Sequence, residues 1–281
     1  MQRFYFRFIN LLFVFYMIAS IHVYAENVSL SELKLSKIIE LQQSFFKNST
    51  TLPEEELLRQ AQYLVNQYES YLNENPKDVN GLILFGKFLK KTGHPEDAFS
   101  KFWQADLFNP NIAVTKQQIG NFFVENGRVI EAFPFFIHAT RLEPNEPSYH
   151  FDLGNFIYIF EEQLSSVDHD ENLGKLMHQS FKHAAYLKPE DLDYQLRFAQ
   201  SFFDFNHSNL NDGLVAWEKL LTDFSDRTKE ETDYIKLGIA KMLMKLNKPD
   251  DALNLLSSVQ TKSLLHSKGI LIQKILLLRN K

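Results

Sequence analysis

The chain of 281 residues contains no cysteine. This absence excludes disulfide bonds, thiol catalysis, zinc sites built on cysteine and a lipid-modified N-terminal cysteine. Positive charge is also scarce, because 30 basic residues stand against 35 acidic residues and the net charge is −5. The sequence therefore offers no basic surface for nucleic acid, and we expect no DNA or RNA partner.

Motifs that carry catalysis are missing as well. The sequence has no Gly-rich phosphate loop, no nucleophile elbow and no His-Glu-x-x-His helix. His138 and His183 occupy equivalent places in adjacent repeats, as described below, but two histidines without a third ligand make a poor metal site. We therefore expect both on the solvated surface, and we expect neither a cofactor nor catalytic activity.

Long apolar runs are absent except at the N-terminus. Arg3 and Arg7 precede an apolar run over 8–19, and the small residues Val23 and Ala25 follow it. A basic start, a short apolar core and small residues at the −3 and −1 positions are typical of a secretory signal peptide. We expect cleavage after Ala25 and a periplasmic or secreted mature protein.

The alternative for the N-terminus is an uncleaved membrane anchor. Residues 8–25 have about the minimum length that spans a bilayer. Ser20 and His22 weaken that interpretation because they place polar groups inside the span. A membrane contact is expected only if this segment is retained.

The chain does have an internal repeat. Pro76, Pro110 and Pro144 follow one another at a constant interval of 34 (110−76 and 144−110). The same interval separates further residues of a few types: Gly86, Gly120 and Gly154; Gly93 and Gly127; Ala98 and Ala132; Phe102 and Phe136; Ala105 and Ala139. A fixed period of this size predicts an architecture of stacked repeats.

Each repeat has the pattern of two helices. Phe85, Gly86 and Leu89 belong to one apolar stripe with helical spacing. Gly93 supplies a residue that can end this helix with positive φ, and Pro95 can occupy the first turn of the next. In the next repeat, the second helix should begin near Val129 and survive a proline at position 134.

This pattern resembles the tetratricopeptide repeat. The family's helix positions are filled in the first repeat by Phe85, Gly86, Leu89, Gly93, Ala98, Phe102, Ala105 and Pro110. They are filled in the second by Ile119, Gly120, Phe123, Gly127, Ala132, Phe136, Ala139 and Pro144. The resemblance implies an all-α fold, a right-handed superhelix (α-solenoid) of stacked antiparallel helix pairs.

The resemblance also implies a division of the chain. After the signal peptide at 1–25, we expect an N-terminal capping pair at 26–78, about five repeats over 79–262 and a C-terminal capping helix at 263–281. The repeats are expected at 79–112, 113–146, 147–191, 192–228 and 229–262. The third repeat is longer than the first two, since Pro144 and Pro189 stand 45 apart (189−144), which predicts an insertion at about 162–174.

The insertion at 162–174 contains Asp168, Asp170 and Asn172, which resemble the start of a calcium loop. A calcium loop of this kind needs a glycine directly after the third ligand and a glutamate at the twelfth place. Here the glycine comes one residue late and the twelfth place is Gln179. We therefore expect a solvated polar loop and no metal site.

In this family the first helix of each repeat lines a concave groove that holds a peptide or a partner helix. One groove position reads Lys87, Asn121, Asn155 and Gln200 in successive repeats, with Lys241 in the fifth. Carboxamides can both donate to and accept from an extended peptide backbone. The candidate groove residues are Lys87, Lys90, Lys91, Gln117, Asn121, Glu125, Phe151, Asn155, Tyr158 and Gln200.

These residues could also be no more than the polar faces of amphipathic helices. One subgroup of the family clamps C-terminal carboxylates with lysine and asparagine at defined positions. Ile83, Lys87 and Asp152 stand at three of those positions, so that clamp is absent. The expected function is an exported, non-catalytic scaffold or adaptor that binds a protein or peptide.

Two alternatives remain at this stage. One is a metal-dependent or hydrolytic enzyme that uses the insertion at 162–174 and nearby histidines. The other is an envelope structural subunit held in the membrane by its N-terminus. Each would be recognised by a measurement: metal content for the first and the mass of the mature N-terminus for the second.

Overall fold

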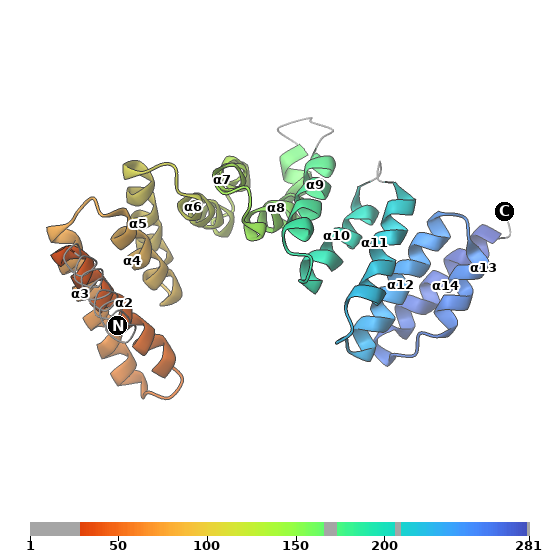
Figure 1. Ribbon diagram of the computed structural model, residues 1–281, viewed down its shortest axis with the longest axis horizontal. Coiled ribbons are helices and arrows are strands. Elements are labelled where there is room, and N and C mark those ends of the chain that lie inside the picture. Colours follow the sequence, from red (N-terminus) through yellow and green to blue (C-terminus); the bar gives the residue numbers. More distant parts are fainter. Residues whose placement is uncertain (1–28, 166–172, 206–208, 280–281) are drawn as a thin grey trace, which may run out of the picture. The chain divides into compact units, whose positions relative to one another are not determined.

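The computed structural model describes residues 29–165, 173–205 and 209–279 (Figure 1). The described residues form thirteen α-helices and one 3₁₀ turn, and no strand occurs among them. They fall into two compact units, which meet in sequence at Pro110 and Asn111. The predicted signal peptide and the positions that resemble a calcium loop, Asp168, Asp170 and Asn172, lie outside the described residues.

The first unit contains two helix pairs. Its helices are α2 (Leu30–Asn48), α3 (Glu54–Glu74), α4 (Val79–Lys91) and α5 (Pro95–Phe108). A capping box fixes the start of α2, because Ser29 and Glu32 each hydrogen-bond the other's backbone N–H. Phe88 is fully buried between the pairs, with its ring 5.7 Å from that of Phe45 and 6.1 Å from that of Tyr68.

The second unit continues the pattern of paired helices. Its helices are α6 (Ala113–Glu125), α7 (Val129–Leu142), α8 (Pro147–Ser165), α9 (Leu173–Leu187), α10 (Leu192–Asp204), α11 (Leu210–Asp223), α12 (Lys229–Lys245), α13 (Pro249–Ser257) and α14 (Leu265–Arg279). A 3₁₀ turn, η1 (Lys262–Leu264), precedes the last helix. Figure 1 shows α12, α13 and α14 side by side at the C-terminal end.

The repeated Gly and Phe positions make the contact between the two helices of a pair. A Cβ atom on the glycine of the first helix would lie close to the phenylalanine ring of the second. This holds for three pairs: Gly86 with Phe102 at 2.9 Å, Gly120 with Phe136 at 3.2 Å and Gly154 with Phe181 at 2.7 Å. The glycine therefore makes room for the ring, which explains why both residues recur.

Pro134 lies inside α7, and the helix continues through it. The helix begins at Val129, as expected from the sequence, so Pro134 is its sixth residue and falls in the second turn. Only the hydrogen bond to the carbonyl of Ile130 is lost there, because proline has no backbone N–H. The prediction that this helix survives its proline is confirmed.

Both ends of the predicted insertion are helical. Helix α8 runs on to Ser165, with a break in its helical angles at Phe160 (φ −115°, ψ 18°). Helix α9 already begins at Leu173. The segment 162–174 is therefore not a polar loop throughout, because its first four and last two residues extend the helices of the third pair.

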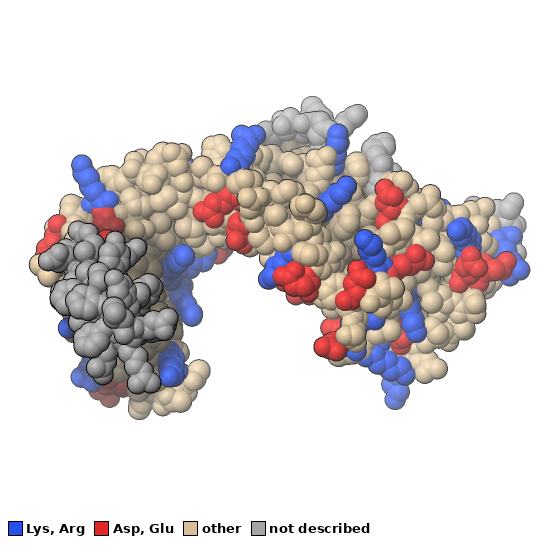
Figure 2. All heavy atoms as spheres, viewed as in Figure 1, with Lys and Arg blue, Asp and Glu red and all other residues tan. Residues whose placement is uncertain are grey.

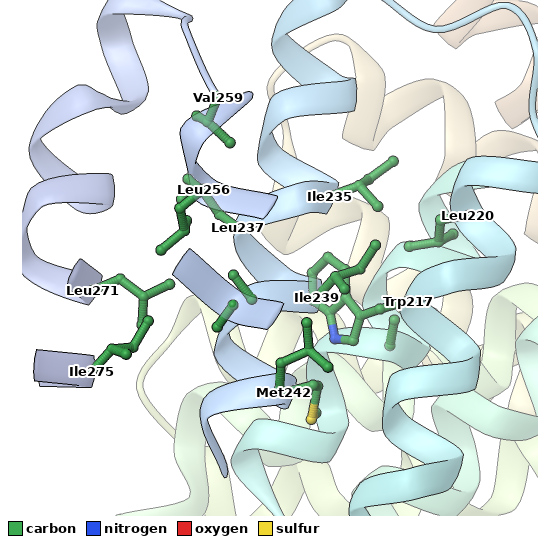
Figure 3. Packing of buried hydrophobic residues seen from close by; sticks show 14 of the residues in the cluster. Trp217, Leu220, Ile235, Leu237, Ile239, Met242, Leu256, Val259, Leu271 and Ile275 are labelled. Carbon is green, nitrogen blue, oxygen red and sulfur yellow. The ribbon is translucent and has the colours of Figure 1, made fainter. Parts of the chain in front are cut away.

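The C-terminal half of the second unit has an extensive apolar core. Trp217 of α11 is 1% exposed and packs beside Ile239 and Met242 of α12 (Figure 3). A Cβ atom at Gly238 would lie 2.3 Å from the indole ring, so the indole rests directly on the backbone of α12. Leu271 of α14 belongs to the same cluster, which ties the last helix to the repeats.

None of the described helices combines the length and the hydropathy needed to cross a bilayer. Acidic and basic side chains are interspersed over the second unit on the face drawn in Figure 2.

Candidate functional site

The first helices of successive pairs in the second unit, α6, α8, α10 and α12, are joined by side-chain contacts. Between α6 and α8, the Gln117 amide donates a hydrogen bond to the Asp152 carboxylate. Burial raises the pKa of Asp152, and the hydrogen bond from Gln117 partly offsets that rise. The helices that the family would use to line a groove are therefore neighbours here.

Aromatic and amide side chains make the next two links. Between α8 and α10, the rings of Phe151 and Tyr194 lie 4.7 Å apart. Between α10 and α12, Gln200 Nε2 donates to the Tyr234 hydroxyl at 3.0 Å. We call the surface formed by exposed and half-buried residues of α6, α8, α10 and α12 the A-helix face. Its members are Gln117, Asn121, Phe151, Asn155, Tyr158, Tyr194, Gln200 and Tyr234.

Arg197 fixes the middle of the A-helix face. Its guanidinium carbon lies 4.1 Å from the ring centroid of Tyr158 and 4.2 Å from that of Phe181. It also pairs with Asp204, with 3.0 Å between Nη1 and Oδ2, and its side chain is only 12% exposed. The planar guanidinium of Arg197 stacks on two rings and forms one ion pair, and these contacts fix its orientation. Arg197 therefore holds Tyr158 in place.

Asn121 and Asn155 differ from the other amides of the A-helix face. Both are half-buried, on α6 and α8 respectively. Neither carboxamide forms a hydrogen bond with any group in the described part of the chain, whereas Gln117 and Gln200 each do. The two asparagines therefore keep both a donor and an acceptor for a ligand.

The other predicted site residues are divided between the two units. Glu125 is exposed at the end of α6. Lys87 is exposed and Lys90 half-buried on α4 of the first unit. Lys91 is exposed on the same helix, and its Nζ lies 4.0 Å from the Phe46 ring centroid.

His138 and His183 are both exposed, as expected from the sequence. His183 faces His150, with ring centroids 4.3 Å apart, and both rings lie within hydrogen-bond distance of the Pro144 carbonyl. His138 is exposed and takes no part in this pair. No cluster of three or more residues that could ligate a metal occurs among the residues with described positions.

His178 on α9 gives the second unit an acid-sensitive contact. Its Nδ1 lies 2.8 Å from Ser201 Oγ, and its ring packs 4.6 Å from that of Phe202. Burial lowers the pKa of His178 below its ordinary value of 6.5, and the charge of Lys182 lowers it further. The unfolded chain therefore binds this proton more readily than the folded protein does.

We expect the free energy of unfolding to fall as the pH drops below about 6.5, the ordinary histidine pKa. Replacing His178 by Gln should flatten this dependence between pH 7 and pH 5, because glutamine does not titrate. Urea unfolding at a series of pH values measures it. A variant whose pH dependence matches that of the original chain would show that His178 is not responsible.

Sequence reasoning did not identify Arg197, Tyr194 or Tyr234 as members of the candidate site. The ring partners of Arg197 come from α8 and α9, so no local pattern around position 197 indicates them. A lone cation between apolar positions, Leu196 and Phe198, is the only signal in the sequence.

Solved structures of other proteins have folds similar to that of this chain. YrrB, described as a TPR protein with an unusual peptide-binding site, is 18% identical over 72% of this chain and 97% of YrrB, with a TM-score of 0.59. PilF of Pseudomonas aeruginosa is 12% identical over 89% of this chain and 99% of PilF, with a TM-score of 0.56. PilW, a type IV pilus biogenesis factor, is 14% identical over 89% and 99%, with a TM-score of 0.52.

No protein-family model matches the sequence, and no curated protein matches it. The structural likeness nevertheless agrees with the motif that recurs along the sequence. The protein has the fold of the tetratricopeptide-repeat proteins, an all-α solenoid of stacked antiparallel helix pairs. The tetratricopeptide-repeat fold and the all-α fold class predicted from the sequence are confirmed.

Proposed function

We propose that the protein is a non-catalytic scaffold that binds an extended peptide segment of a partner protein on the A-helix face of its second unit. The observation that carries this proposal is the pair of half-buried carboxamides, Asn121 and Asn155, with no hydrogen-bond partner in the described chain. They stand at equivalent positions of α6 and α8. Each can donate to and accept from one peptide unit of a bound segment.

The surroundings of the two asparagines suit a peptide. Phe151 and Tyr158 offer aromatic surface on α8, and Arg197 holds Tyr158 in place. Tyr158 is 49% exposed, so its ring is available to a side chain of the partner. YrrB, a TPR protein with a peptide-binding site, supports this choice of ligand class by fold analogy.

The charge preference and the location are further parts of the proposal. Lys87 and Lys91 are exposed on α4, so the first unit offers cations of its own to an acidic partner. Residues 1–25 have the pattern of a signal peptide, which favours a periplasmic or secreted scaffold.

The test compares two double variants of the full chain. Peptides that bind the protein are first selected from a displayed random library, and their Kd values are then measured by calorimetry. Replacing Asn121 and Asn155 by Ala should weaken the selected peptides by about tenfold or more, since each lost backbone hydrogen bond costs about 0.5–1.5 kcal/mol. Circular dichroism checks that the variant is folded.

The control replaces two exposed amides on second helices, Gln179 on α9 and Asn254 on α13, by Ala. It removes the same number of carboxamides and should leave the Kd unchanged. If both double variants bind the selected peptides as the original chain does, the A-helix face is not the binding site.

A further inference from the structure

A pocket of about 330 Å³ lies between α10, α12 and α14 in the second unit. Its lining includes Gln200 and Tyr234, which also belong to the A-helix face, and residues of the C-terminal helix α14. The lining residues that matter for a ligand are Trp217, Gly238, Lys241, Ser267, Ile270 and Lys274. This volume is at the lower end of the range for ligand pockets.

The walls of this pocket are mostly apolar and partly aromatic. Trp217 lines it and is held against the backbone at Gly238, which also lines it. Ile270 is 43% exposed and Tyr234 is 39% exposed at its margin. A large apolar side chain of a ligand would find aromatic and aliphatic partners there and would cover exposed apolar surface.

Positive charge gathers at the same place. Lys241 Nζ lies 3.9 Å from the Phe203 ring centroid, and Lys245 Nζ lies 6.0 Å from it. Lys274 of α14 also lines the pocket, and its charge acts on Lys241. The two lysines that line the pocket form no ion pair with a carboxylate in the described chain, and the nearby Asp204 is already paired with Arg197 at 3.0 Å.

Two further observations favour a ligand group here that is negatively charged or accepts hydrogen bonds. Burial lowers the pKa of Lys241, and the positive charges of Lys245 and Lys274 lower it further. The negative charge of Asp204 partly opposes this shift. The indole Nε1 of Trp217 is buried and has no hydrogen-bond partner among the described residues. An anion bound near these groups would compensate charge that the chain itself leaves uncompensated.

We infer that this pocket binds a peptide in which a large apolar side chain stands next to a carboxylate, with the side chain among Trp217, Tyr234 and Ile270 and the carboxylate between Lys241 and Lys274. The carboxylate is either the C-terminus of the peptide or the side chain of an adjacent acidic residue. A peptide is favoured because the pocket continues the A-helix face at Gln200 and Tyr234, so the inference rests on the proposed function. It differs from the family's carboxylate clamp, whose positions are not filled in this chain.

The experiment uses Trp217 as the reporter. The chain has two tryptophans, and replacing Trp103 by Phe in the full chain leaves Trp217 alone. Four blocked peptides are titrated: acetyl-Gly-Ser-Leu-Phe as the free acid, the same peptide as the amide, acetyl-Gly-Phe-Glu-Gly-Ser-amide, and its counterpart with Gln in place of Glu. The free acid and the glutamate peptide distinguish the two sources of the carboxylate.

We expect at least one charged peptide to change Trp217 emission saturably, and its uncharged counterpart to bind about tenfold more weakly, which corresponds to about 1.4 kcal/mol. Replacing Lys241 and Lys274 by Gln should remove this difference and leave the uncharged peptides unaffected. Replacing Lys175 and Lys219, two exposed lysines outside the pocket, by Gln is the control with equal net charge and should change nothing.

A second variant, Ser267→Phe, fills the pocket from the exposed side of α14 and keeps both lysines. It should abolish the binding of all four peptides. The inference is overturned if no peptide changes Trp217 emission, if the charged and uncharged peptides bind equally in both pairs, or if decanoate binds while the peptides do not. A failure of the proposed function would be seen separately, in the Asn121 and Asn155 experiment, because those residues do not line the pocket.

Discussion

Replacing Trp217 by Ala is expected to lower the free energy of unfolding by about 3–5 kcal/mol, as for other fully buried tryptophans. The indole is 1% exposed, and it rests on Gly238 of the next helix, where a Cβ atom would lie only 2.3 Å away. Because the backbone of α12 lies directly against this ring, a small side chain leaves a cavity that no neighbour can fill. Urea unfolding followed by circular dichroism measures the loss.

The control for this prediction is Trp103→Phe. Trp103 is 40% exposed on α5, and phenylalanine keeps most of its ring contact with Phe99. We expect a change within about 0.5 kcal/mol. If Trp217→Ala lost no more than this control does, the apolar cluster around the indole would not stabilise the second unit as described.

Replacing Asp233 by Ala should cost about 2–4 kcal/mol, because it removes a buried carboxylate that accepts three hydrogen bonds. Asp233 of α12 is buried, and its Oδ2 accepts from the backbone N–H groups of Gln260 and Thr261 at 2.9 Å each. It also accepts from the Thr261 hydroxyl at 2.7 Å. This one carboxylate therefore anchors the segment that leads from α13 into η1 and α14.

The same carboxylate predicts a pH dependence. Burial raises the pKa of Asp233, but the hydrogen bonds from Thr261 and Gln260 outweigh burial and lower it overall. Its contribution is therefore present above the ordinary aspartate pKa of 3.8 and is lost as the pH falls below that value. Asp233→Ala should remove this acid-sensitive part of the unfolding free energy.

Glu218→Ala is the matched control for Asp233, since Glu218 is an exposed carboxylate on α11. Its loss should change stability by less than about 0.5 kcal/mol and leave the acid dependence intact. Equal losses in the two variants would mean that the contacts of Asp233 with Gln260 and Thr261 do not hold the C-terminal segment.

The fold was predictable because its contacts are local and recur. The glycine and phenylalanine of a pair lie on adjacent helices, so one repeat of the sequence encodes both the turn and the contact. The later helices were harder to align, since Trp217 and Gly238 bring together the second helix of one pair and the first helix of the next. No periodic spacing within one repeat indicates such a contact.

The candidate site was predictable only in part. The sequence showed a row of amides but could not distinguish Asn121 and Asn155 from Gln117 and Gln200. Glutamine has one methylene more than asparagine, and in the structure both glutamines reach the first helix of the next pair and hydrogen-bond there. Side-chain length, which spacing alone does not reveal, therefore separates the amides that join helices from those left for a ligand.

The recurring Gly and Phe contact also has a consequence for the speed of folding. Its partners stand at positions 86 and 102, at 120 and 136, and at 154 and 181, so the first two separations are equal and the third is longer. Contacts this close in sequence need only short loops to close, so each helix pair can form before distant parts of the chain meet. Closing the longer third loop costs only about 0.5 kcal/mol more, because the entropy of closure grows with the logarithm of length. The third pair should therefore fold almost as readily as its neighbours, and its extra residues impose little kinetic penalty.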